Sequence, residues 1–218
     1  MNDFFTEAQR KLQSEFETTD LADRIVEAVV TEELSDLQSE FILNRNMFYL
    51  STIDESGYPS CSYKGGDLGF VRVIDPRTVV FPNYDGNGMF MSMGNIQAKE
   101  KVGLLFIDFE TPQRLRLRGE ARCHRKGPML ASYPGANLVV EISVDHVWVN
   151  CPRYVHRMQS LEESPYLPGK DGNTALALWK RIDIVQDVLK SQDRAEAESL
   201  GLITVEEYEA YVARGKLL

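Results

Sequence analysis

Three stretches of the sequence carry side chains suited to holding a charged ligand. In the first, Arg114–Arg118, arginine alternates with leucine. Alternate residues of a strand face opposite sides, so Leu115 and Leu117 would face a core while Arg114, Arg116 and Arg118 line the other side. A guanidinium can hold a phosphate or a carboxylate through paired hydrogen bonds. The pattern also fits a solvated face paired with neighbouring acids, and both interpretations stay open.

The other two stretches combine polar residues with glycine. Ser62–Gly66 ends a predicted strand, so Lys64 would present an ammonium group beside flexible backbone N–H groups. Asp85–Gly88 leads through Ser92 and Asn95 into a predicted short helix. The free N–H groups at a helix start suit a phosphate. Each pattern also occurs in ordinary turns, and together they indicate an anionic ligand without naming it.

The chain shows no motif for chemistry of its own. It has no nucleophile elbow, P-loop or paired-carboxylate motif, and the glycines of 84–95 lack the dinucleotide spacing. The three cysteines have no CxxC spacing and the three histidines form no HExxH pair, so we expect no metal site and mostly buried, reduced thiols. These absences favour a bound cofactor that carries the chemistry.

The elements that position these stretches are predicted to form an antiparallel barrel. Residues 3–43 have helical spacing, with a helix start near Thr31. Two hairpins are predicted over 46–63 and 70–83, followed by strands at 102–109, 114–123 and 138–150. Six to seven strands with short connections and helices at both ends indicate a mainly β fold, not an alternating βαβ sheet.

The last predicted strand changes phase along its length. Val140, Ile142 and Val144 share one face, whereas Val147 and Val149 share the other. The slip falls near Asp145 and His146 and predicts a β-bulge or a bend.

The chain is expected to have three parts. These are an N-terminal helical segment over 1–45, the barrel over 46–159, and a linker with C-terminal helices over 160–218. The linker is rich in proline and glycine, and 174–214 has helical spacing with a capping box at Thr204 and Glu207. We expect this tail to pack on the barrel or on a partner subunit.

Composition limits the partners. The 218 residues carry a net charge of −9, which repels nucleic-acid backbones and predicts no nucleic-acid partner. No apolar run approaches the ~20 residues that a bilayer span requires, and the N-terminus does not resemble a signal peptide. A cytoplasmic protein with no membrane association is therefore expected.

Several separated motifs resemble one known family. Residues 62–73 read SYKGGDLGFVRV, 84–90 read YDGNGMF and 150–154 read NCPRY. Over roughly 46–150, the sequence resembles the pyridoxamine 5′-phosphate oxidase-like family of FMN-binding split-barrel proteins, particularly the members that carry these motifs. The resemblance implies a split β-barrel, FMN as cofactor, and a homodimer with FMN at the subunit interface. It also implies a small-molecule substrate or a reductant such as NAD(P)H.

The resemblance, carried over position by position, implies a set of cofactor-binding residues. They are Ser62, Tyr63, Lys64, Gly65, Asn83, Asp85, Gly86, Asn87, Gly88, Ser92, Asn95, Arg114, Arg116, Asn150, Arg153 and Tyr154. Many relatives have arginine in place of Gly88, so phosphate binding here would depend more on Lys64, backbone N–H groups and another arginine.

Function is not fixed by this resemblance. A long helical tail replaces the family's short substrate-binding ending, so we do not expect the pyridoxamine 5′-phosphate oxidase reaction itself. The first hypothesis is an FMN-dependent oxidoreductase with an unknown small substrate and no assigned catalytic residue. The second is a non-catalytic or redox-sensing module for flavin, haem or a deazaflavin, and the third is an interaction protein without a cofactor.

Overall fold

A computed structural model describes residues 4–216, so the first three and last two residues of the predicted terminal parts lie outside it. The N-terminal part forms α1 (Glu7–Glu15), α2 (Thr19–Val29), the short strand β1 (Val30–Thr31) and α3 (Asp36–Leu43). Thr6 is the N-cap of α1 and Ser35 that of α3, each with a reciprocal capping box. The predicted helix start near Thr31 is therefore wrong, because Thr31 pairs with β8 and the cap lies at Ser35.

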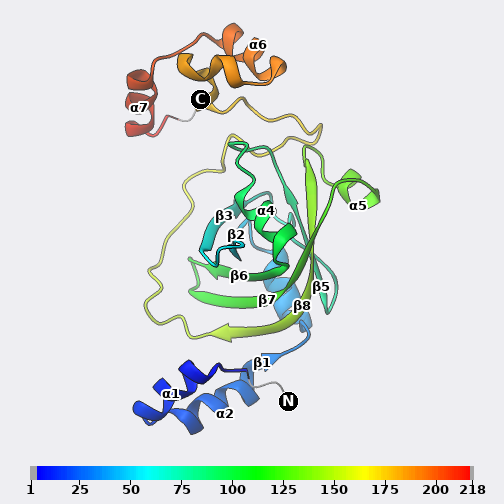
Figure 1. The fold of residues 1–218 in the computed structure, drawn as a ribbon, viewed down its shortest axis with the longest axis vertical. Coiled ribbons are helices and arrows are strands. Elements are labelled where there is room, and N and C mark those ends of the chain that lie inside the picture. The colour runs from blue at the N-terminus through cyan, green and yellow to red at the C-terminus, as the bar shows by residue number, and fades with distance from the viewer. Residues whose placement is uncertain (1–3, 217–218) are drawn as a thin grey trace.

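One eight-stranded antiparallel sheet forms the body of the molecule (Figure 1). The strand order is β3-β2-β6-β7-β8-β5-β4, with β1 added on β8. The end strands β3 and β4 do not pair with each other, so the barrel is open. The predicted fold class is confirmed, and β1 was missed because two residues show no periodicity. The remaining strands are β2 (Met47–Ile53), β3 (Pro59–Gly65), β4 (Arg72–Asp75), β5 (Thr78–Asn83), β6 (Lys101–Asp108), β7 (Gln113–His124) and β8 (Leu138–Asn150).

The core lies on the inner face of this curved sheet. Phe48, Phe81 and Phe106 are fully buried there, and the Phe48 ring contacts Phe81 edge-on and Phe106 at a tilt. Helix α4 (Met91–Ala98) packs on β2, β3 and β7. Leu115 and Leu117 are buried between the outward-facing arginines, which confirms the alternation predicted for this strand.

The phase slip in the last strand is a β-bulge. Arg118 pairs with His146 and Gly119 pairs with Val144, so Asp145 is the extra residue of β8. The bulge returns Val147 to the core, where it is fully buried. Opposite the bulge only glycine fits, because a Cβ on Gly119 would lie 2.1 Å from the carbonyl oxygen of Ser143.

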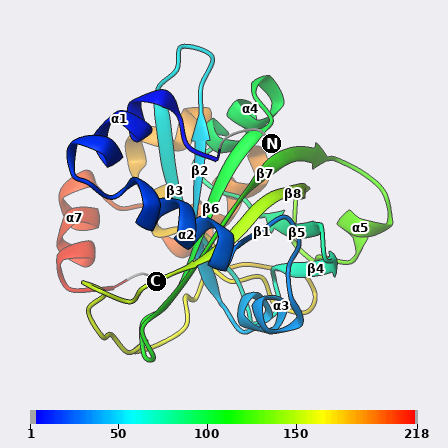
Figure 2. The same ribbon diagram turned by 90° about the horizontal axis from the view of Figure 1, so that it is seen from below.

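The tail forms a small module at the opposite end of the barrel from α1 and α2 (Figures 1 and 2). Residues 178–213, called the C-terminal module below, share a separate small core of Leu178, Ile182 and Ile203. The capping box of Thr204 and Glu207 begins its last helix as predicted. The helical spacing predicted over 174–214 corresponds in its first part to two 3₁₀ helices and not to an α-helix. The elements of the module are η1 (Leu178–Arg181), η2 (Asp183–Val188), α6 (Ser191–Leu200) and α7 (Val205–Ala213). The remaining helix, α5 (Pro128–Ala131), precedes β8 and lies outside the module.

Other expectations concern cysteines, metals and membranes. Cys61 and Cys151 are exposed and Cys123 is partly buried, so the expectation of mostly buried thiols is wrong. Within residues 4–216, no three His, Cys, Asp or Glu side chains gather as metal ligands would. None of the helices in that range combines the length and apolar character of a membrane span.

Candidate functional site

A cleft of about 650 Å³ lies along the edge strand β3. Its walls come from β3 and Gly66 after it, the loop after β5, the start of α4, and the linker over 160–167. The strand order explains why this site exists. β3 pairs with β2 along its whole length on one side, whereas no strand within residues 4–216 covers its other side. Backbone N–H and C=O groups on that free side can therefore bind a ligand.

Lys64 is the unpaired cation of the cleft. It shares the inner face of β3 with Ser62, and it lies opposite the buried Phe48 of β2. Among residues 4–216, no acceptor lies within hydrogen-bonding or ion-pairing distance of its ammonium group. Burial lowers the pKa of Lys64 below its ordinary value. A half-buried ammonium group without a counter-ion is costly, and an anion in the cleft would relieve that cost.

The loop before α4 forms the opposite wall. Gly88 has a φ of 77° and Phe90 a φ of 50°, both left-handed, and the Asn87 side chain accepts a hydrogen bond from the Met89 N–H at 3.1 Å. A Cβ placed on Gly86 or Gly88 would meet no atom within 4 Å, so the backbone here borders open space. Phe90 caps α4 without a side-chain hydrogen bond, which leaves the first N–H groups of the helix to other acceptors.

Most of the predicted binding residues line this cleft. Ser62 and Ser92 join its two walls, with their hydroxyl oxygens 3.0 Å apart. Asn95 turns into the barrel instead, where its Nδ2 donates to Thr52 at 3.0 Å. Cofactor binding by the whole set stays a prediction. The predicted residues that line the cleft are Ser62, Tyr63, Lys64, Gly65, Asn83, Asp85, Gly86, Asn87, Gly88 and Ser92.

The remaining predicted residues lie elsewhere in the chain. Arg114 and Arg116 face outward on β7, and Asn150, the last residue of β8, pairs with Arg114 across the two strands. The Nη2 group of Arg114 donates to the Cys151 carbonyl, and Arg116 is exposed. Arg153 and Tyr154 follow β8 and are exposed. None of these side chains lines the cleft of its own chain.

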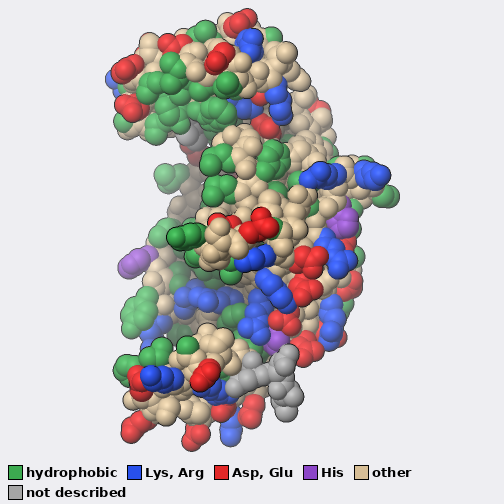
Figure 3. Space-filling view, viewed as in Figure 1, with side chains coloured by type: hydrophobic (Ala, Val, Ile, Leu, Met, Phe, Trp, Pro, Cys, Tyr) green, Lys and Arg blue, Asp and Glu red, His purple; other side chains and the backbone are tan. Residues whose placement is uncertain are grey.

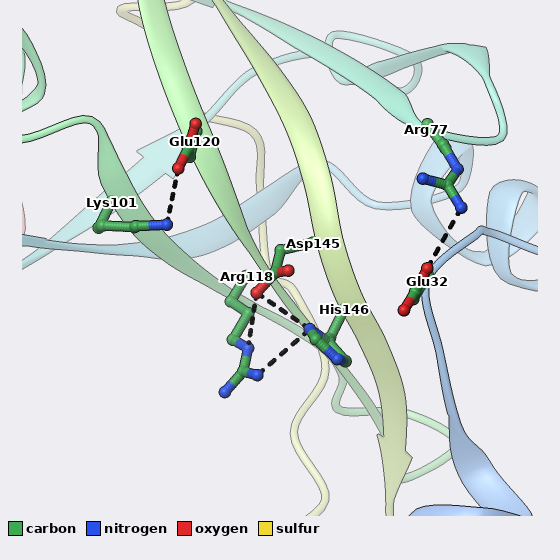
Figure 4. A network of polar contacts seen from close by, with 7 residues as sticks. All are labelled: Glu32, Arg77, Lys101, Arg118, Glu120, Asp145 and His146. Carbon is green, nitrogen blue, oxygen red and sulfur yellow. Dashed lines mark hydrogen bonds and ion pairs between the residues drawn. The ribbon is translucent and has the colours of Figure 1, made fainter. Parts of the chain in front are cut away.

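The third arginine of β7 matches the solvated-face interpretation. Nε of Arg118 lies 3.2 Å from the Asp145 carboxylate, and Nη2 lies 3.2 Å from His146 Nδ1 (Figure 4). Burial alone would raise the pKa of Asp145, but the His146 hydrogen bond and the Arg118 charge outweigh it and lower that pKa. The Arg118 guanidinium therefore contacts the two bulge residues Asp145 and His146.

Two parts of the cleft wall escaped sequence reasoning. The linker contributes Glu162, Glu163 and Tyr166 among others, and nothing in its composition placed it beside β3. Met89, Phe90 and Met91 lie at the cleft with 52–65% of each side chain exposed. Three consecutive large apolar residues where a glycine-rich loop enters a helix were the available signal, because such a loop normally carries polar residues.

The open antiparallel barrel and the cleft at its edge strand define the chain as a split-barrel protein with a ligand-sized site. The sequence model of the family described as pyridoxamine 5′-phosphate oxidase matches residues 34–165, which is more than half of the 218 residues. The chain therefore belongs to this family, as the motifs predicted. The matched region ends before the C-terminal module begins.

Several solved structures are similar to the chain. A putative pyridoxamine 5′-phosphate oxidase from Lactobacillus delbrueckii is 25% identical, with a TM-score of 0.45, over 54% of this chain and 95% of that one. An FMN-binding protein from Syntrophomonas wolfei is 12% identical, with a TM-score of 0.39, over 64% and 97%. The haem storage protein HutZ from Vibrio cholerae is 16% identical, with a TM-score of 0.39, over 50% and 89%. No curated protein matches the sequence.

Proposed function

We propose that the chain binds FMN in the cleft beside β3 and acts as a flavin-dependent oxidoreductase on a small molecule. The observation that carries the proposal is Lys64, a half-buried and unpaired cation beside the free edge of a strand. Family membership supports the choice of FMN among anionic ligands.

The residues of the cleft fit such a cofactor. Its volume of about 650 Å³ falls in the range of small-molecule and cofactor sites. Lys64, the free N–H groups of β3 and those at the start of α4 would hold the anionic and polar parts. Met89, Phe90 and Met91 offer apolar surface for a ring system. When bound, FMN would supply hydride or electron transfer, which no side-chain arrangement in the cleft supplies.

The proposed active form is a homodimer with FMN at the subunit interface. Arg114, Arg116 and Asn150 face away from the cleft of their own chain. A second copy would bring such outward side chains to the cleft, and it would also exclude water from the ligand. Because Gly88 carries no side chain, an arginine from a second copy would complete the recognition of a phosphate.

The histidine positions weaken haem as an alternative ligand. None of the residues that line the cleft is a histidine. His146 Nδ1 lies 2.9 Å from the Asp145 carboxylate, and His124 Nε2 lies 3.5 Å from that of Glu141. Both rings lie on strands of the sheet and not at the cleft, although His124 Nε2 has no hydrogen-bond partner among described residues. The third histidine, His156, is exposed beyond β8 and does not line the cleft either.

The first test is the visible absorption spectrum of the purified protein after incubation with FMN and gel filtration. We expect retained flavin bands at about one FMN per chain, eluting with a dimer. Colourless protein that does not retain FMN would refute the proposal, and a Soret band would indicate haem as the ligand in place of flavin. Anaerobic bleaching of bound flavin by NAD(P)H, followed by recovery with a small acceptor, would distinguish an oxidoreductase from a carrier.

A further inference from the structure

A buried lysine of the tail binds the loop of the cleft. Lys180 belongs to η1, and its side chain is only 9% exposed. Its Nζ donates to the Asp85 carboxylate at 2.6 Å and to the Asp193 carboxylate at 3.0 Å. Asp85 begins the glycine-rich loop of the cleft, whereas Asp193 lies in the first turn of α6. The ammonium group thus connects the module to a carboxylate that lies 95 positions from Lys180 in the chain.

The module holds this lysine in place from its own side. Gln186 Nε2 donates to the carbonyl of Lys180 at 2.9 Å and to that of Ile182 at 2.7 Å. The Trp179 ring centroid lies 5.9 Å from the ammonium nitrogen. Burial acts to lower the pKa of Lys180, but its hydrogen bonds to Asp85 and Asp193 outweigh burial and raise it. The lysine is therefore charged throughout the physiological pH range.

Asp85 is the polar joint between the C-terminal module and the barrel. Among described residues, every hydrogen bond or ion pair found between the module and the barrel involves Asp85. Lys180 Nζ lies 2.6 Å from its carboxylate, and Lys190 Nζ lies 3.8 Å from it. The apolar core of the module is separate from the barrel core. Figure 3 shows apolar side chains gathered on the lower side of the module in that view.

The loop that receives this contact has few other restraints. Asp85 is followed by Gly86 and Gly88, and glycine loses more conformational freedom on ordering than any other residue. The Asn87 hydrogen bond to Met89 is local to the loop. An anchor at Asp85 therefore removes conformations in which the loop no longer lines the cleft.

We propose that Lys180 is a positioning residue for the cleft, through which docking of the C-terminal module holds residues 84–90 in their ligand-binding form. The coupling is reciprocal, so a ligand in the cleft strengthens docking of the module. The choice of FMN as probe rests on the proposed function, whereas the positioning itself does not. The module begins at Leu178, after the region 34–165 that matches the family. The contact from Lys180 to the loop therefore comes from a part of the chain that the family model does not cover.

The test compares Lys180→Met with the matched control Lys190→Met. Lys190 approaches the same carboxylate but is 79% exposed, so its contribution should be small. Hydrogen–deuterium exchange of 84–90 and 178–213 is measured without ligand, and FMN affinity by fluorescence titration. We expect faster exchange in both segments and affinity about tenfold weaker for Lys180→Met, the size of one charge-assisted hydrogen bond. Lys190→Met should match wild type, and Lys180→Arg should restore most of the loss.

Unchanged exchange of 84–90 in ligand-free Lys180→Met would overturn the proposal, as would wild-type FMN affinity in that variant. If wild type itself fails to bind FMN, the proposed function fails while the exchange comparison still decides the positioning role. Asp85→Asn provides a second variant should Lys180→Met not fold, because it removes the same contact from the exposed side of the pair. It should loosen the module to a similar extent.

Discussion

Replacing Lys64 by methionine should weaken ligand binding and strengthen the ligand-free fold. The substitution keeps the length of the side chain but removes the unpaired ammonium group from the cleft. A charge-assisted hydrogen bond contributes about 1.5–3 kcal/mol, so FMN affinity should fall by about 10- to 150-fold. Binding should not be abolished, because the free edge of β3 and the N–H groups of α4 remain.

Stability should change in the opposite direction. Without ligand, Lys64 is a half-buried charge that has no partner among the described residues, and methionine has no such cost. The gain should be about 0.5 kcal/mol, since part of the side chain remains hydrated, and it corresponds to a Tm rise of roughly 1–2 °C.

The pH dependence follows from the lowered pKa of Lys64. The unfolded chain keeps this proton up to the ordinary value of 10.5, whereas the folded chain releases it earlier. Wild-type stability therefore gains a contribution as pH rises from the lowered pKa towards 10.5, and Lys64→Met lacks it. FMN affinity should fall over the same window in wild type, as the ammonium group becomes neutral.

The assays are fluorescence titration with FMN and thermal unfolding without it. Lys126→Met is the matched control, because Lys126 is an exposed lysine outside the cleft. The reasoning fails if Lys64→Met binds FMN as tightly as wild type, or if it loses stability in the ligand-free state.

Three further substitutions test the fold. Gly119→Ala places a Cβ 2.1 Å from a Ser143 backbone oxygen and should lower the free energy of unfolding by more than ~2 kcal/mol in chemical denaturation. The control Gly103→Ala makes an ordinary contact at 3.7 Å and should be tolerated. Equal losses of stability in the two variants would contradict the bulge geometry. Tyr133→Phe should be neutral or slightly stabilising at pH 7, because the buried hydroxyl has no partner among described residues. Burial raises the pKa of Tyr133 to about 12, so wild type should lose stability relative to Tyr133→Phe between pH 10 and 12, and parallel pH profiles would count against this. Thr204→Ala should cost about 0.5–2 kcal/mol through the lost cap of α7, seen as faster amide exchange in α7 alone, and unchanged exchange there would contradict the capping role.

Much of the fold was predictable because strand periodicity survives in this sequence. The spacing of Leu115 and Leu117 predicted the inner face of β7, and the spacing of the valines in β8 predicted its bulge. Prediction failed where periodicity was absent or misleading. β1 is too short to show a pattern, and the apolar spacing near 175–189 fits an α-helix although the chain forms 3₁₀ turns there.

The candidate site was predictable only where its residues are close in sequence. Lys64 and the loop around Gly86 were found because glycine and charge lie together there. The linker wall and the Lys180 contact depend on tertiary packing, and charges 95 residues apart carry no local signal. The sixteen predicted residues also came partly from family motifs, which do not separate the contacts of one subunit from those of another.

Asp145, the single extra residue in β8, determines which side chains face the core in the rest of that strand. Before Asp145 the even-numbered residues Ile142 and Val144 face the core, whereas after it the odd-numbered Val147 does. Deleting Asp145 would therefore exchange the inward and outward sets over 146–150. An alignment or a graft that drops this position would preserve most of the sequence and yet present the wrong side chains at the start of the NCPRY motif.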